Sequence, residues 1–517
     1  MEPSENLPLW PGLRRLNGHG GCRCDGRPPA AAAHARRPRP PRATRLPPPP
    51  ARRRTARQPL AATARPNLQR RRQEVCISTN TQTLFNLVNV IMGAGFVSMP
   101  YACRMGGWAS LAVVWALCAV FAWTGTVVLD CCRRVDAARA AAAAAGRPPK
   151  QQEGAPPAAA AGGAGLRRAG YEDTAEAAFG PVARRIVSGL MYAELLGICI
   201  VYFVLEAEAL STLLAHTPAA AALAAALPPG ANVFAAASAA LIIPTVLLPD
   251  LAALSGLGAL SVAAALSLGA ALALLWWAGP AAAGAAAAAA GSAAAVVPAT
   301  LPQVLGIVAF VYAGHSTFPV VQQSMRRPGD APRVLVAAYV TVAAICSFVG
   351  WFGYATYGAT AADVITANLP KGAPLTLACV MLTAVSPFAA FALTLEPVAL
   401  ALQRAFVAAK GGGGEAPYAL RAAVRLGLAA VCAAAAAVLP HVADLMALVG
   451  AVLTTSISLM LPAAARLVLA GDELSPGGAA AAAGVMLLGA AIAVVGARSA
   501  LGSLAGKVGG AAAVAGV

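Results

Sequence analysis

The chain has 517 residues, of which 59% are hydrophobic and only 11% carry a charged side chain, and its formal net charge is +17. A soluble domain contains roughly 25% charged residues, so this composition excludes an ordinary soluble protein and requires a bilayer as the solvent. The charge argues against a nucleic-acid-binding body, because residues 1–79 hold 17 Arg against four acids and account for most of it.

The basic segment 1–79 is rich in Arg and Pro and has almost no large apolar side chains. It cannot offset the entropy lost on ordering, so it is predicted to be a disordered tail. Three interpretations are open: a solvated cytosolic tail near anionic lipid head groups, an Arg-rich transit peptide, and a nucleic-acid-binding arm. We expect the first, with no nucleic acid among the partners.

Apolar stretches long enough to cross a bilayer recur from Thr81 onward. Eleven membrane spans are predicted: Thr81–Ala102, Gly107–Cys131, Ile186–Leu214, Val233–Leu248, Leu251–Trp277, Val304–Val321, Val334–Tyr357, Pro374–Gln403, Ala422–Leu439, Leu445–Ala465 and Ala479–Ala497.

Loop charges support this count. With the N-terminal tail placed in the cytosol, 34 of the 38 Lys and Arg fall on the cytosolic side and four on the other. This agrees with the tendency of cytosolic loops to be positive, so the N-terminus is predicted to be cytosolic. The membrane domain is predicted over residues 80–499, with a flexible cytosolic loop at 135–168, a surface helix near Tyr171–Gly180 and a short C-terminal tail at 500–517.

The first span is interrupted in its middle by Gly93-Ala94-Gly95, a few residues after Asn86 and Asn89. Polar and helix-breaking residues are costly in lipid, and small residues allow a helix to unwind. Unwinding frees backbone groups that bind a small zwitterion or an ion. Close packing of helices through small residues is the alternative interpretation.

The sixth span has a second break, at Tyr312-Ala313-Gly314-His315, followed by Pro319. An inverted five-plus-five repeat pairs the first span with the sixth, and paired interruptions point to a transport site. His315 lies within the span, where it has either a structural hydrogen bond or a role in handling protons or substrate.

Acidic residues inside spans are rare and usually functional. The third span carries Glu194, Glu206 and Glu208, and the eighth carries Glu396 beside Pro397. Glu396, His315 and Glu194 are the candidates for proton coupling, and a structural hydrogen bond is the alternative for Glu396. The sequence shows no nucleotide-binding loop, catalytic constellation or metal-ligand cluster, so no cofactor, no metal and no enzyme activity are expected.

Several segments, in their order and spacing, resemble the amino acid/auxin permease family, in particular its vesicular inhibitory amino acid and vacuolar amino acid transporters. The resemblance covers Ser78 to about Arg466. Its blocks are Asn86–Tyr101 with Gly106-Gly107-Trp108, Tyr171–Gly180 with Tyr192–Leu195 and Leu205–Leu210, Tyr312–Pro319 with Ser324-Met325, Gly353-Tyr354 and Asn368-Leu369-Pro370, and Asp444–Gly450.

The resemblance implies an all-α fold of the amino acid–polyamine–organocation type, with about eleven helices and broken first and sixth helices. It implies substrate binding at those breaks and transport driven by a proton gradient. The residues expected at the substrate are Asn89, Gly93, Ala94, Gly95, Tyr312, Gly314 and His315. The chain departs from the family at Glu396, where a small or amide residue is usual, and at Glu206-Ala207-Glu208-Ala209, where Glu-Gly-Asp-Asn is usual.

We therefore expect a secondary transporter that carries amino acids across an internal membrane, such as that of the vacuole, with protons as the coupling ion. Two alternatives remain open. One is a plasma-membrane importer coupled to sodium, and the other is a receptor that binds amino acids without transporting them.

Overall fold

The computed structural model describes residues 78–145, 168–215, 217–227, 232–247, 258–284, 287, 293–411 and 416–515. All of them belong to one of the two compact units of the chain, Arg70–Val517. The predicted tail 1–79, apart from Ser78 and Thr79, lies outside the described residues, as does most of the predicted loop 135–168.

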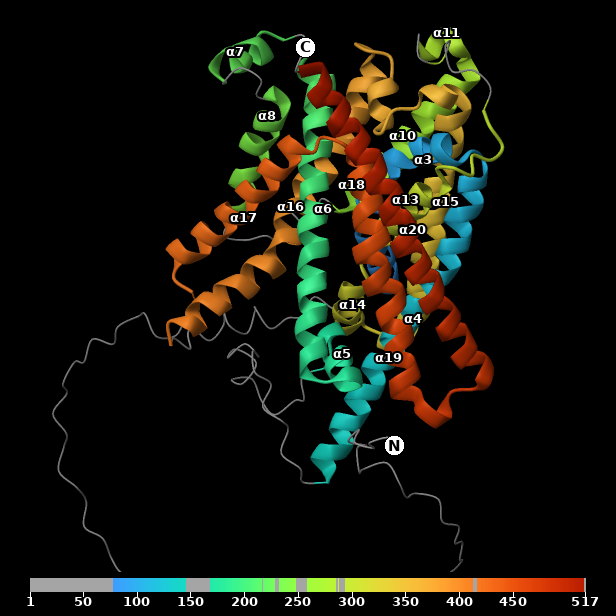
Figure 1. Cartoon of the computed structure of the whole chain (residues 1–517), viewed down its shortest axis with the longest axis vertical. Helices are drawn as coiled ribbons and strands as arrows, with labels where there is room; N and C mark the ends of the chain where they lie inside the picture. The colour runs from blue at the N-terminus through green and yellow to red at the C-terminus, as the bar shows by residue number, and fades with distance from the viewer. Residues whose placement is uncertain are drawn as a thin grey trace, which may run out of the picture. The chain divides into compact units, whose positions relative to one another are not determined.

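The described residues are almost entirely helical (Figure 1). The helices that correspond to the predicted spans are α2 (Asn80–Met92) with η1 (Gly95–Ser98) and α3 (Met99–Gly106), α4 (Ala109–Ala144), α6 (Pro181–Leu214), α8 (Val233–Ile242) with η3 (Ile243–Leu247), α10 (Gly258–Ala278), α13 (Leu301–Val311) with η4 (His315–Thr317) and α14 (Phe318–Ser324), α15 (Ala331–Tyr357), α16 (Pro374–Ala409), α17 (Tyr418–Val438), α18 (Val442–Val449) with α19 (Leu461–Ala470), and α20 (Pro476–Ala515).

Short helices fill the connections between these spans. They are α5 (Tyr171–Phe179), α7 (Pro218–Ala226), α11 (Pro280–Ala283), η5 (Pro328–Asp330), η6 (Gly358–Thr360), η7 (Ile365–Asn368) and η10 (Gly471–Glu473). Two π-helical segments, η8 (Gly450–Thr454) and η9 (Ser456–Met460), join α18 to α19.

Every predicted span contains a helix, and the polytopic all-α class is confirmed. Within the described residues, nine helices are long and apolar enough to cross a membrane, and the bent pair Asn80–Met92 and Gly95–Gly106 makes a tenth. The predicted fourth span is the exception, because Val233–Leu247 is a shorter apolar helix. Helix length within the described residues therefore supports ten of the eleven predicted spans; the residues that flank Val233–Leu247 are largely outside the described part, and the fourth span stays a prediction.

Two predicted boundaries need correction. Helix α4 continues to Ala144, so the first residues of the predicted flexible loop 135–168 are helical. Helix α20 continues to Ala515, through the predicted C-terminal tail 500–517. Both extensions are rich in alanine, which has the highest intrinsic helix propensity and needs no packing partner to favour a helix.

Helix α5 and the end of α4 lie together at one end of the helices, called the inner end below, and α3 and α11 lie toward the opposite, outer end (Figure 1). Tryptophans gather at the outer end: the ring centroid of Trp351 lies 5.9 Å from that of Trp108 and 5.4 Å from that of Trp276. Tryptophan is enriched where a membrane meets water, so this cluster marks the outer interface.

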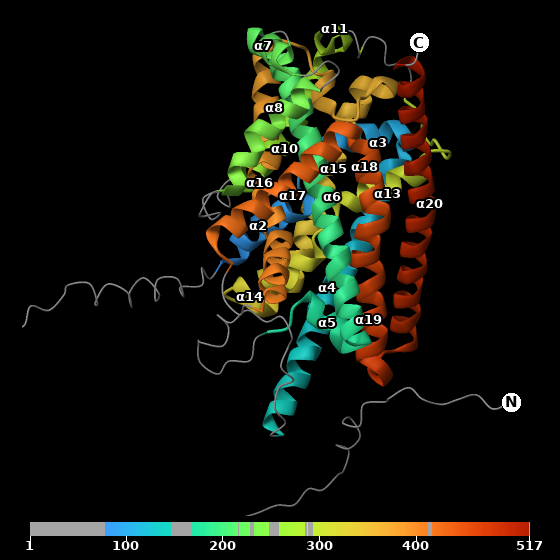
Figure 2. The same ribbon diagram turned by 60° about the vertical axis from the view of Figure 1, so that its left-hand side comes forward.

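Helices α13 and α18 pack backbone against backbone. A β-carbon placed on Gly450 would overlap the carbonyl oxygen of Gly306, and one placed on Gly306 would overlap that of Ala447. Only glycine permits so close an approach. Helix α20 contacts both α13 and α18 and runs beside α18 in both views (Figures 1 and 2).

The inner ends of the first and sixth predicted spans are tied together. The backbone N–H of Ser78 donates to the carbonyl of Ser324 at 2.9 Å, and the N–H of Arg326 donates to the carbonyl of Ser78 at 3.1 Å. These bonds form an isolated parallel β-bridge between Ser78 and Met325. The side chain of Asn80 adds a 2.9 Å hydrogen bond to Asp330.

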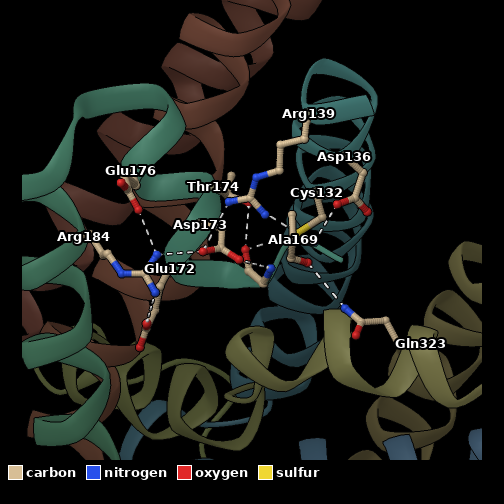
Figure 3. A network of polar contacts seen from close by, with 11 residues as sticks. Cys132, Asp136, Arg139, Ala169, Glu172, Asp173, Thr174, Glu176, Arg184 and Gln323 are labelled. Atoms are coloured by element: carbon tan, nitrogen blue, oxygen red, sulfur yellow. Dashed lines mark hydrogen bonds and ion pairs between the residues drawn. The ribbon is translucent and has the colours of Figure 1, made fainter. Parts of the chain in front are cut away.

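The predicted surface helix near Tyr171–Gly180 is helix α5, which a network of ion pairs holds at the inner end (Figure 3). Buried Asp173 lies at its centre. Its carboxylate accepts hydrogen bonds from the backbone N–H of Gly170 at 2.8 Å and from Arg184 of α6 at 2.7 Å. Arg139 of α4 lies 3.5 Å from the same carboxylate, so α4, α5 and α6 share one charged centre.

Asp173→Asn is expected to lower the stability of the folded protein at neutral pH by about 2 kcal/mol, the scale of hydrogen bonds to a charged group. Burial alone would raise the pKa of Asp173, but the Gly170 N–H, Arg184 and Arg139 together lower it below the usual 3.8. A carboxyl with a lowered folded pKa contributes stability that is complete above the unfolded pKa and is lost as the pH falls below it.

Thermal unfolding in detergent at pH 7 and at pH 3.5 tests this expectation. Asp173→Asn should be less stable at pH 7 and should lose less stability than the unsubstituted protein on acidification. Asp472→Asn, at an exposed position, is the control. An unchanged pH dependence in Asp173→Asn would contradict the assignment.

Candidate functional site

The first break lies between α2 and α3. Helix α2 ends at Met92, and Gly93 takes a positive φ of 49°, which an L side chain rarely adopts. The chain continues through Ala94 and η1 into α3, with Pro100 in the first turn, and the two halves meet at an angle of 48°. The predicted unwinding at Gly93–Gly95 is present.

The second break repeats this arrangement. Helix α13 ends at Val311, Gly314 takes a φ of 117°, η4 follows, and α14 has Pro319 in its first turn. In both spans a helix thus gives way to a glycine with positive φ, a 3-10 turn and a short helix that begins with proline. Proline suits the first turn of a helix because it lacks the N–H that would have no partner there.

The two breaks meet in space. A β-carbon placed on Gly95 would lie 2.6 Å from the Cγ2 atom of Val311, and one placed on Gly314 would lie 3.1 Å from the Cγ1 atom of Val90. The structure therefore brings together Gly93, Ala94, Gly95 and Gly314 at the junction of two interrupted helices. Asn89 is half-buried on the last turns of α2, close to this junction.

The side chains of Tyr312 and His315 are fully buried beside α4 and α15. The hydroxyl of Tyr312 donates to the carbonyl of Val114 at 3.0 Å. The ring of His315 has partners on both nitrogens: Nε2 lies 2.9 Å from the hydroxyl of Thr124 and 3.1 Å from the carbonyl of Phe121, and Nδ1 lies 3.3 Å from the hydroxyl of Tyr339.

These contacts define how His315 is held. The Phe121 carbonyl can only accept, so Nε2 carries a hydrogen. The Tyr339 hydroxyl beside Nδ1 also donates to the Tyr312 carbonyl at 3.3 Å, and together these contacts fix η4 against two neighbouring helices. Tyr312 and His315, which were predicted at the substrate, therefore have structural hydrogen bonds that shape the second break.

Glu194 is buried in α6, and its carboxyl accepts a 2.8 Å hydrogen bond from Thr454 of η8. A π-helical segment widens the helix by one residue per turn and is frequent at functional sites. Thr454 was not identified from the sequence, because nothing local to residues 450–460 reveals π-helical hydrogen bonding.

Glu396 has a different environment. Its carboxylate forms an ion pair with Arg425 of α17 at 2.6 Å, and Arg425 also donates to the carbonyl of Val246 at 3.2 Å. This pair ties α16, α17 and η3 together. Arg425 is thus a structural partner of Glu396 that the spacing of the two residues in the sequence did not suggest.

A second charged centre at the outer end was also missed. Asp444 of α18 is buried; its Oδ1 lies 2.5 Å from the amide of Gln303 on α13, and its Oδ2 lies 2.7 Å from Lys507 on α20. Lys507 lies 3.9 Å from Asp363, in the loop after α15. Asp444 thus joins three helices, including the outer half of the interrupted sixth span.

Tyr202 is a further residue that sequence reasoning missed. It is buried on α6, and a β-carbon placed on Gly93 would lie 3.6 Å from its hydroxyl oxygen. The third span therefore reaches the first break through this side chain.

The sequence was compared with known proteins. The family described as "Transmembrane amino acid transporter protein" matches residues 77–144 and 160–505. The chain is 28% identical over 433 residues to the amino acid transporter AVT1B of Arabidopsis thaliana, a match that covers 83% of the chain and 71% of the relative.

Two further relatives extend the comparison. The Arabidopsis thaliana amino acid transporter AVT1C is 27% identical over 438 residues, 84% of the chain and 72% of the relative. The vesicular GABA transporter of Caenorhabditis elegans is 21% identical over 290 residues, 56% of the chain and 50% of the relative.

Proposed function

Because the chain belongs to the transmembrane amino acid transporter family, we propose that it carries amino acids across a membrane by proton-coupled, alternating-access transport. The observation that carries this proposal is the meeting of two interrupted helices at Gly93–Gly95 and Gly314. Interrupted helices near the middle of a bilayer leave backbone groups free to bind a charged substrate.

The substrate site is proposed at this junction. The backbone N–H groups of Ala94 and Gly95 would bind the substrate carboxylate, since that of Gly93 already donates to the Asn89 carbonyl at 3.0 Å. Gly93 would allow the close approach of the substrate, and the Asn89 side chain would contact it. The second break would contribute chiefly through its backbone, at Tyr312, Gly314 and His315. The side chains of Tyr312 and His315 are already hydrogen-bonded within the fold, and Gly314 has a positive φ.

Among the three candidates for proton coupling, Glu194 has the best support. Its carboxyl is buried and, within the described residues, has only a neutral hydroxyl as a hydrogen-bond partner, whereas Glu396 is paired with Arg425 and His315 has partners on both nitrogens. A buried acid without a cationic partner can bind and release a proton as its access to water changes.

We place the protein in the vacuolar or another internal membrane, with a cytosolic N-terminus. The distribution of Lys and Arg supports this orientation. A relative named as a vesicular transporter supports an internal membrane over the plasma membrane.

Uptake of radiolabelled amino acids into proteoliposomes that hold the purified protein tests the proposal. We expect uptake that an imposed proton gradient stimulates and that replacement of sodium by choline leaves unchanged. Gradient-driven uptake should fall at least tenfold in Glu194→Gln. Sodium-dependent uptake would support the importer alternative, and binding of amino acids without flux would support the receptor alternative.

A further inference from the structure

Glu206 differs from the other buried acids. Among the described residues, four acidic side chains are buried: Asp173, Glu194, Glu206 and Asp444. Three of them have hydrogen-bond partners, as described above. Glu206 is only 2% exposed, yet its Oε2 atom has no hydrogen-bond partner in the described part of the chain.

The position of Glu206 relates it to the first break. Tyr202 precedes it by one turn of α6, so the two side chains share a face of the helix. The Tyr202 hydroxyl lies beside Gly93, and α6 runs from the inner end at Pro181 to the outer end at Leu214. Glu206 therefore lies one turn beyond the residue that contacts the break, toward the outer end.

The charged groups on the transmembrane helices packed against α6 are paired elsewhere or exposed, and Arg404 of α16 and Arg421 of α17 are exposed. Glu396 of α16 pairs with Arg425 of α17, and Asp444 of α18 pairs with Lys507 of α20. Glu208, the next acid along α6, is half-buried. Within the described residues, no charged side chain interacts with Glu206.

An ionised carboxylate buried without a partner is strongly unfavourable, so the enclosed form of Glu206 is the neutral acid. When the pathway opens and water reaches the carboxyl, its charged form becomes favourable. A carboxyl that exchanges its proton with water only while the site is open to that water can couple proton movement to the opening and closing of the site.

We propose that Glu206 is a second proton-binding site, which takes the coupling proton from water at the outer face. This inference rests on the proposed proton-coupled transport. The proton bonds to a carboxylate oxygen while Glu206 is hydrated from the outer side, and it returns to water after the loaded protein reorients. Glu206 follows Glu194 by 12 residues, roughly 18 Å along the helix, so the two buried acids of α6 are well separated along its axis.

The test compares Glu206→Gln with Glu208→Gln in proteoliposomes. Glu208→Gln removes an acid two residues away that is only half-buried, so it is a matched control. Counterflow of radiolabelled amino acid at equal pH measures substrate exchange, and accumulation under a pH gradient measures coupling. A pH-sensitive dye inside the vesicles reports proton entry on addition of amino acid.

We expect the counterflow rate of Glu206→Gln to stay within about twofold of that of the unsubstituted protein. Its gradient-driven accumulation of amino acid should fall at least tenfold, and addition of amino acid should cause no proton entry. Glu208→Gln should behave like the unsubstituted protein. Accumulation by Glu206→Gln at the unsubstituted level would overturn the inference.

Loss of counterflow in Glu206→Gln would make Glu206→Asp the deciding variant. Amino acid accumulation by Glu206→Asp with a shifted pH profile would support proton binding at this position. Inactivity of Glu206→Asp at every pH would show a structural role for Glu206 and would overturn the inference. If the unsubstituted protein exchanges amino acids but ignores the gradient, the inference fails while amino acid transport stands. If it exchanges no amino acid, both fail.

Discussion

Replacing Gly450 with alanine is expected to destabilise the protein by about 3 kcal/mol, the upper end of the usual cost of overpacking, and to abolish amino acid uptake, because the added methyl group has no space. A β-carbon at this position would overlap the carbonyl oxygen of Gly306 and lie 2.6 Å from the backbone nitrogen of Phe310. Backbone atoms cannot rotate away as a flexible side chain can, so α13 and α18 would have to separate. This separation would also displace the second break, which begins one residue after Val311.

Gly427→Ala is the matched control for this substitution. Gly427 also lies within a helix, but a β-carbon there would meet nothing within 4 Å. Alanine has the higher helix propensity, so this variant should be as stable as the unsubstituted protein or slightly more stable. Size-exclusion profiles and thermal unfolding in detergent measure both variants. Equal stability of Gly450→Ala and Gly427→Ala would contradict the close approach of α13 and α18.

Asp444→Ala is expected to be the second most damaging substitution, at about 3 kcal/mol, the lower end of the cost of removing one partner from a buried ion pair, because Asp444 is fully buried but Lys507 is 35% exposed. It would leave Lys507 without its nearest carboxylate and the amide of Gln303 without its acceptor. Because these two residues lie on α20 and α13, we expect loss of the contact between the C-terminal helix and the outer half of the sixth span.

Two further variants show whether the lost charge pair is the cause. Asp472→Ala removes an exposed acid and should change the unfolding temperature little. The double variant Asp444→Leu with Lys507→Leu removes both charges and should recover much of the stability, since apolar replacement of a complete buried pair is often neutral. A double variant no more stable than Asp444→Ala would mean that the loss does not arise from an unpaired Lys507.

The sequence predicted most of the fold because membrane spans are local features. A run of apolar residues reveals a span, and the Gly93–Gly95 and Gly314 breaks are visible because glycine and proline act on the backbone of their own segment. In the predicted fourth span, α8 gives way to a 3-10 turn around Pro244, and the residues that follow Leu247 lie outside the described part of the chain. Alanine-rich extensions of α4 and α20 resemble loops in composition, although they are helical.

The partners of the site residues could not be predicted in the same way. Glu396 meets Arg425 from another helix, and Asp444 meets Lys507 from 63 residues away. Whether an intramembrane acid is paired depends on how helices pack, which no local pattern specifies. The hydrogen-bond partners of His315 are also remote in sequence, with Thr124 191 residues away and Tyr339 24 residues away.

The β-bridge at Ser78 has a mechanical consequence. It joins the start of the first interrupted span to the end of the sixth, so the inner ends of both are fastened at one point. A displacement of the inner half of either interrupted span is therefore passed to the other through these backbone hydrogen bonds.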